Sequence, residues 1–140
     1  MPKCSIEFHL VPDAKEFPWQ KEFASLGRRI LREESAEGLV NVILCPDEQV
    51  RTLNRDYRGL DKVTDVLSFE WHAEGILGEI YIAEAQIKKQ APRYLNSFKA
   101  ELRRMYVHGL LHLCGHDHML APERKRMRER EDFFLTGKLS

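Results

Sequence analysis

The sequence predicts an α+β domain in which a small mixed β-sheet is covered by helices. The chain has 140 residues, 43% of them hydrophobic, which is enough for one core and leaves little room for a second domain. Four short segments carry strand patterns, and the other regular segments have helical spacing. The expected order over residues 1–140 is therefore β-α-β-α-β-β-α-α-α, in a single domain.

The first half of the chain alternates strand and helix patterns. Apolar and polar residues alternate over Ser5–Val11, which is typical of a half-buried strand. Apolar residues recur at helical spacing over Trp19–Glu34, and the run Leu39–Cys45, rich in β-branched residues, predicts a buried strand. Asp47 is expected to be the N-cap of a short helix that Gly59 ends.

Two strands and then three helices are expected in the second half. The segments Asp65–Trp71 and Leu77–Ala83 have strand patterns and are joined by a polar loop that ends in Gly75. Proline lacks the amide hydrogen that a helix interior needs, so Pro92 should interrupt a helix that begins near Ala83. The other two helices are predicted over Ser97–Cys114 and from Pro122 to Phe134.

Charge is balanced over the whole chain but not along it. Lys and Arg number 22, as do Asp and Glu, yet residues 1–87 carry a net charge of −6 and residues 88–140 one of +6. The C-terminal part can therefore attract a phosphate backbone. No apolar run exceeds four residues, far below the ~20 that cross a bilayer, and the three cysteines form no CxxC pair. These features indicate a cytoplasmic protein with reduced thiols and no membrane partner.

Four of the six histidines fall within the segment HGLLHLCGHDH, which begins at His108. His108 and His112 are one helical turn apart, so both imidazoles can reach one metal ion from the same helix face. Gly115 is the residue type that ends helices, and a chain that folds back there brings His118 to the ion from a second direction. Three imidazoles with an open fourth position are typical of a catalytic site with one zinc ion.

Two further residues of this segment limit its chemistry. His116 continues the stripe of His108 and His112, but in an unbroken helix His108 and His116 would stand ~12 Å apart, whereas zinc–nitrogen bonds are ~2.1 Å. His116 is therefore expected to be a turn residue. The spacing also matches the zinc-peptidase pattern HExxHxxGxxH, except that Gly109 replaces its glutamate general base. Peptide hydrolysis would need a base from elsewhere.

A second segment, LNRDYRGLDKVTDVLSF, begins at Leu53. By composition alone it is a helix end, a charged loop and a strand, in which Arg58 and Lys62 would be solvated surface charges. Taken together, HGLLHLCGHDH, YRGLDKVTDVLSF and GEIYIA (Gly78–Ala83) resemble the YbeY family of metal-dependent endoribonucleases in bacterial ribosomal RNA maturation. The resemblance covers the chain from about Leu53 to His118.

The resemblance implies roles for individual residues. His108, His112 and His118 would bind the zinc ion, and Arg58 corresponds to the family's catalytically important arginine. Glu79 stands where the family's strand motif has an aspartate, which suggests a contact with a ribosomal or GTPase partner. The fold would be zincin-like around the metal-binding helix.

The implied function is single-strand-specific cleavage in maturation of the 3′ end of 16S rRNA and in late assembly or quality control of the small ribosomal subunit. The implied partners are the rRNA precursor, the small subunit and its assembly proteins. The planar guanidinium of Arg58 suits a phosphodiester, because it can pair with two phosphate oxygens. Lys62 and Arg104 are expected to contact the RNA. Spacing assigns neither a general base nor an oligomeric state.

Two alternatives remain open at this point. The first is a zinc peptidase that takes its base from elsewhere in the chain. The second is a ribosome assembly factor in which zinc stabilises the fold and no reaction occurs. The assembly-factor alternative predicts that substitution of Arg58 leaves function intact. An Arg58 variant can therefore distinguish this alternative from the nuclease hypothesis.

Overall fold

The structure is a computed structural model that describes residues 4–10, 18–73, 75–117 and 119–136. At its centre is a four-stranded sheet with the order β1-β2-β4-β3. Its strands are β1 (Cys4–Leu10), β2 (Gly38–Cys45), β3 (Val66–Ala73) and β4 (Ile76–Ala83). β1, β2 and β4 are parallel, whereas β3 pairs antiparallel with β4 at one edge, so the sheet is mixed as predicted.

The helices follow the predicted order closely. Parallel neighbours need a crossover connection, which α1 provides between β1 and β2. The helical segments are α1 (Gln20–Glu33), α2 (Asp47–Arg58), α3 (Glu84–Gln90), the 3₁₀ turn η1 (Ala91–Tyr94), α4 (Phe98–Leu113) and α5 (Ala121–Thr136). The 3₁₀ turn contains Pro92, which confirms the expected interruption.

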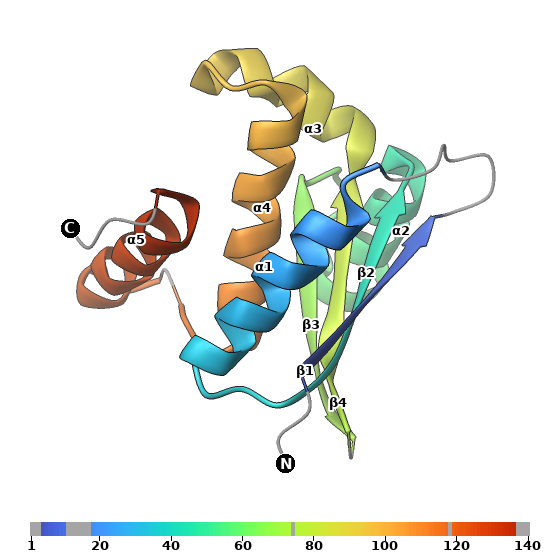
Figure 1. The fold of residues 1–140 in the computed structure, drawn as a ribbon. Coiled ribbons are helices and arrows are strands. Elements are labelled where there is room, and N and C mark those ends of the chain that lie inside the picture. Colours follow the sequence, from blue (N-terminus) through green and yellow to red (C-terminus); the bar gives the residue numbers. More distant parts are fainter. Residues whose placement is uncertain (1–3, 11–17, 74, 118, 137–140) are drawn as a thin grey trace.

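Helices cover the sheet on both faces. α1 and α4 lie on one face and α2 on the other, while α5 packs on α4 and not on the sheet (Figure 1). Side chains alternate along each strand, so β2 directs Val40, Val42 and Leu44 into the larger core beneath α1 and α4. Val50 and Leu67 belong to a smaller cluster under α2. No described helix is long and apolar enough to span a membrane.

The start of α2 differs from the prediction. Pro46 occupies the N-cap position with an extended backbone, and Asp47 is the first helical residue, without a side-chain cap hydrogen bond. The fixed φ of proline ends β2 and starts the helix in one step, so no capping side chain is required. By contrast, the Ser97 hydroxyl accepts a hydrogen bond from the Ala100 amide at 3.1 Å and caps α4, the helix that carries the histidines.

A buried polar network joins α4 to the sheet. Glu101 is fully buried, and its carboxylate accepts hydrogen bonds from Gln90 at 2.7 Å and Asn96 at 2.9 Å, and two from Arg104 at 2.9 and 2.6 Å. Gln90 also donates to Asp65, just before β3, at 3.1 Å. Burial alone would raise the pKa of Glu101, but the hydrogen bonds outweigh burial and hold that pKa below its usual value.

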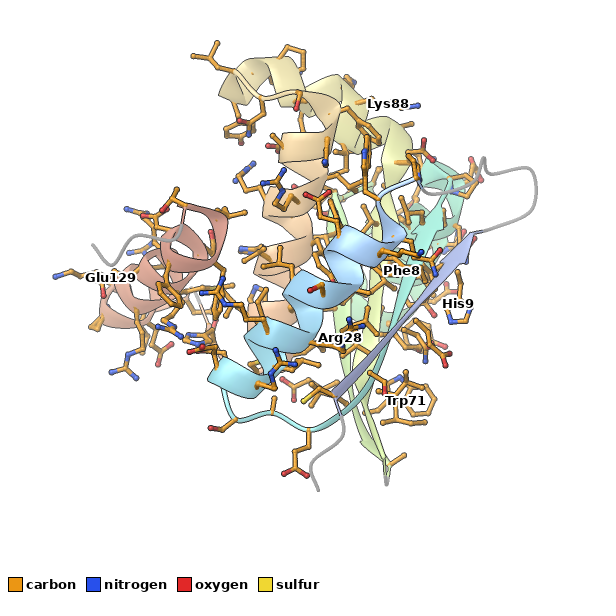
Figure 2. The ribbon with its side chains drawn as sticks, viewed as in Figure 1. Phe8, His9, Arg28, Trp71, Lys88 and Glu129 are labelled. Carbon is orange, nitrogen blue, oxygen red and sulfur yellow. The ribbon has the colours of Figure 1, made fainter. Side chains whose placement is uncertain are left out.

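Glu101→Gln should lower the free energy of unfolding at neutral pH by about 2 kcal/mol, because Arg104 loses its charged partner. The folded-state pKa of Glu101 is lowered, so its contribution is complete above the unfolded-state value of 4.5 and is lost as the pH falls through the folded-state value. Urea denaturation should therefore show a difference between wild type and variant that shrinks in acid. The control is Glu129→Gln, at an exposed position on α5 (Figure 2). A difference that persists unchanged in acid would contradict this account.

Candidate functional site

Two predicted metal ligands lie together on the last turns of α4. The ring centroids of His108 and His112 are 4.7 Å apart, with ring planes at 82°. Their surroundings on α4 are buried apolar residues such as Leu110 and Leu111, so the two imidazoles are polar groups on an otherwise apolar helix end. Both line a cavity of about 680 Å³ between α4 and β3, here called the α4–β3 cavity.

The turn after α4 takes the predicted form. Gly115 has a φ of +99°, a left-handed conformation that glycine adopts without strain, and its amide donates to the His112 carbonyl at 3.0 Å. His116 then lies in the turn, with its Nε2 hydrogen-bonded to Glu34 at the C-terminal end of α1. Arg130 of α5 donates to the other oxygen of Glu34 at 2.8 and 3.0 Å. α1 and α5 thus hold the chain just beyond the histidine helix.

Glu131 is a site residue that the sequence analysis did not find. Its Oε1 lies 2.8 Å from Nδ1 of His108, and both side chains are largely buried. A carboxylate beside Nδ1 favours the tautomer with a proton on Nδ1, which leaves Nε2 unprotonated. An unprotonated imidazole nitrogen is the form that binds zinc, and a carboxylate partner of this kind is common behind zinc-bound histidines. No local pattern pointed to Glu131, because the contact depends on how α5 docks on α4.

Arg58 lies across the α4–β3 cavity from the histidine helix, on the last turn of α2. Its Nη2 donates to the Ser68 carbonyl at 3.0 Å, and its guanidinium carbon lies 5.6 Å from the centroid of the Phe69 ring. These contacts fix the side chain against β3 and use one of its five N–H groups. The structure therefore brings Arg58, His108 and His112 into one cavity.

Two carboxylates near the cavity accept hydrogen bonds, and a nearby thiol is protonated. Asp65 accepts hydrogen bonds from the Val66 amide at 2.8 Å and from Gln90 at 3.1 Å. Asp117 accepts one from the Met119 amide at 3.1 Å. Burial raises the pKa of the Cys114 thiol to about 12, so it stays protonated at neutral pH and is a poor nucleophile. None of these groups is placed by its contacts as an obvious general base.

Gly109, at the position of the peptidase glutamate, packs against the sheet. A Cβ at this position would lie 3.1 Å from Ile80 and 3.2 Å from the Ser68 hydroxyl, tighter than ordinary contact. The Ser68 hydroxyl also donates to the Gly109 carbonyl at 3.3 Å. A side chain at position 109 would therefore meet the β3–β4 hairpin, and this chain has glycine where α4 packs closely against it.

Three other predicted residues, Lys62, Arg104 and Glu79, are not part of the lining of the α4–β3 cavity. Lys62 is exposed in the loop before β3, where its carbonyl accepts a hydrogen bond from Asn54 at 3.0 Å. Arg104 is paired with Glu101 and stacks on Tyr94, with 4.2 Å between guanidinium carbon and ring centroid. Glu79 lies on β4, on the sheet face covered in part by α2, where it lines a pocket with Leu53 and Tyr57. The roles predicted for Lys62, Arg104 and Glu79 stay predictions.

His118, the third predicted zinc ligand, lies outside the described residues. Among residues 4–10, 18–73, 75–117 and 119–136, no group of three or more His, Cys, Asp or Glu side chains is arranged to hold a metal ion. Two imidazoles from α4, one of them backed by a carboxylate on its Nδ1, are ligands that suit zinc. The three-histidine zinc site therefore stays a prediction. The two ligands that the structure describes, His108 and His112, are suited to zinc.

Comparisons with known proteins agree on one family. A family profile described as Endoribonuclease YbeY matches residues 11–138. The chain is 40% identical over 111 residues to the Endoribonuclease YbeY of Desulforamulus reducens, covering 72% of each chain. It is 37% identical over 107 residues to the protein of the same name from Thermotoga maritima, covering 76% of this chain and 71% of the relative. A solution structure of a Thermotoga maritima protein superposes with a TM-score of 0.68 at 31% identity, over 93% of this chain and 86% of the other.

Gly109→Glu should destabilise the protein instead of creating a general base. The new side chain would overpack the contact with Ile80 and bury a carboxylate there, which we expect to cost about 3 kcal/mol or more in the free energy of unfolding. Thermal and urea denaturation would measure this, with Ala85→Glu, at an exposed position on α3, as the matched control. A stable Gly109→Glu variant that hydrolyses peptides would contradict the account and favour the peptidase alternative.

Proposed function

Because the chain belongs to the YbeY family of endoribonucleases, we propose that it cleaves single-stranded RNA with one zinc ion bound at the end of α4. The observation that carries this proposal is the α4–β3 cavity, which His108, His112 and Arg58 line together. The proposed substrate is the precursor of the small-subunit rRNA, cut near the 3′ end of 16S rRNA in the cytoplasm. The proposed partners are the small ribosomal subunit and its assembly proteins.

His108, His112 and His118 would hold the zinc ion. A zinc ion in such a site acts as a Lewis acid that polarises a phosphoryl oxygen and lowers the pKa of bound water to ~7. Glu131 would keep His108 in the tautomer that presents Nε2, and its negative charge would make this imidazole a stronger donor. The link from His116 through Glu34 to Arg130 would hold the chain that leads from α4 toward His118.

Arg58 would bind the scissile phosphate. Its planar guanidinium can donate two parallel hydrogen bonds to phosphate oxygens, and this interaction strengthens as negative charge builds up in the transition state. Because the Ser68 carbonyl and the Phe69 ring already hold the side chain, it would need little reorganisation during the reaction. Removal of one such donor typically lowers kcat by ~10²–10³.

Arg58→Glu should therefore lower RNA cleavage at least ~10²-fold, since it replaces the phosphate-binding charge by a repulsive one. Arg55→Glu is the matched control, because Arg55 is exposed one turn earlier on α2 and is paired with Asp56. His112→Ala should abolish both cleavage and bound zinc. The assay would follow single-stranded RNA from a precursor small-subunit 3′ end, with metal content and circular dichroism measured on each variant. Equal cutting by all variants would indicate a contaminating nuclease and favour the non-catalytic assembly factor.

Glu131→Gln should weaken zinc binding ~10–100-fold while the fold is retained, because the amide lacks the charge that supports His108. Competition with a chromophoric chelator would measure the affinity, independently of RNA cleavage. Glu129→Gln, on the outer side of the same helix, should bind zinc as wild type does (Figure 2). Wild-type affinity in Glu131→Gln would mean that the contact with His108 only joins the helices.

A further inference from the structure

A second cavity lies on the sheet face that α2 covers only in part. Its volume is about 220 Å³, and we call it the aromatic pocket. Its lining residues are Leu53, Tyr57, Phe69, Trp71, Glu79 and Tyr81. Figure 2 shows Trp71 on the side of the sheet away from α1 and α4. Phe69 also lines the α4–β3 cavity, but the site described above gives no role to the rings of Tyr57, Trp71 and Tyr81.

The rings of the aromatic pocket form an exposed surface with a fixed shape. Tyr57 is 72% exposed and Trp71 46% exposed, unusually high fractions for large aromatic side chains. The Phe69 ring makes edge-on contacts with the rings of Tyr57 and Tyr81. The ring centroids are 5.6 Å apart in the first pair and 5.8 Å apart in the second. Because these contacts hold the rings in place, a flat ligand could stack on them at a small cost in side-chain entropy.

The aromatic pocket adjoins the α4–β3 cavity. Phe69 lines both cavities, and Arg58 lies over its ring at the boundary between them. The Tyr57 ring and the Arg58 guanidinium both contact the Phe69 ring, so a phosphate bound by the guanidinium would lie near the exposed Tyr57 ring. A nucleotide has matching parts, because its phosphate and its flat base belong to the same unit.

The electrostatics of the pocket favour a neutral ligand with N–H groups. Glu79 is the charged residue of its lining, and its Oε1 accepts a hydrogen bond from the Trp71 indole at 3.0 Å. This carboxylate would repel a phosphate but can accept hydrogen bonds from the amino or imino group of a base. The positive charge for the phosphate is supplied next door by Arg58.

We propose that the aromatic pocket binds one unstacked base of the RNA strand whose phosphate lies at Arg58. The proposal rests on the proposed function, and it adds a base-binding subsite to the cleavage site. Base stacking on aromatic side chains is a common mode of single-strand binding, and it would exclude a duplex, whose bases are already stacked. The subsite would therefore contribute to a preference for single-stranded RNA.

Trp71 itself supplies the direct test. The chain has two tryptophans, so Trp19→Phe leaves Trp71 as the sole indole fluorophore. A 2′-O-methylated oligoadenylate, checked by gel to stay intact, should quench this fluorescence on binding. An oligomer of equal length without bases keeps the phosphates and should leave the fluorescence unchanged. A fluorescence signal that does not respond to a saturating amount of oligoadenylate would overturn the proposal.

Variants of the zinc-loaded protein complete the test. Tyr57→Ala and Trp71→Leu should each weaken oligoadenylate binding about tenfold, as expected for loss of one stacking contact, with unchanged affinity for the base-free oligomer and unchanged zinc content. Leu95→Ala removes an exposed apolar side chain that is not part of the pocket lining and should bind as wild type does. If the pocket variants bind and cut RNA like wild type, the base subsite is wrong, and a protein partner becomes the better occupant. If wild type neither binds nor cuts RNA, the proposed function itself fails.

Discussion

The close contact between α4 and the edge strand β3 is the constraint on which the candidate site depends. Ser68 joins the two sides, since its hydroxyl donates to the Gly109 carbonyl and its own carbonyl accepts from Arg58. The absence of a side chain at Gly109 sets how near the helix can come. Because packed interiors do not deform continuously, this spacing sets the distance between the arginine and the two histidines of α4.

Charged contacts from α1 and α5 add a second layer behind the histidines. Glu34 and Glu131 are both largely buried carboxylates, and each is paired with a histidine. The two histidines differ in where they lie. Glu131 contacts Nδ1 of His108, at the cavity, whereas Glu34 binds His116 in the turn after the helix. His108 and His116 are eight residues apart in the sequence but have different surroundings. His108 is placed to suit a metal ion, whereas His116 helps to hold the turn after the helix.

Because side chains alternate along β3, this strand contributes to two different surfaces, one on each face of the sheet. Ser68 is on the face that packs against α4, while Phe69 and Trp71 are on the face shared with α2. One edge strand thus contributes to a polar cavity with histidines and to an aromatic pocket. Arg58, at the end of α2, lies where the two surfaces meet. The arrangement places the proposed phosphate-binding arginine beside the proposed base-binding pocket, with Phe69 in contact with both Arg58 and Tyr57.

The sequence by itself determined the order of the elements, the helix that carries His108 and His112, and its end at Gly115. These features depend on interactions within a few residues, namely side-chain periodicity and backbone preference. It pointed to Arg58 only through the resemblance to a known family. The tertiary structure alone decided which carboxylates support the site, because Glu131 and Glu34 lie 23 and 82 residues from the histidines they contact. Such pairs form only when whole helices dock, and no local pattern encodes that docking.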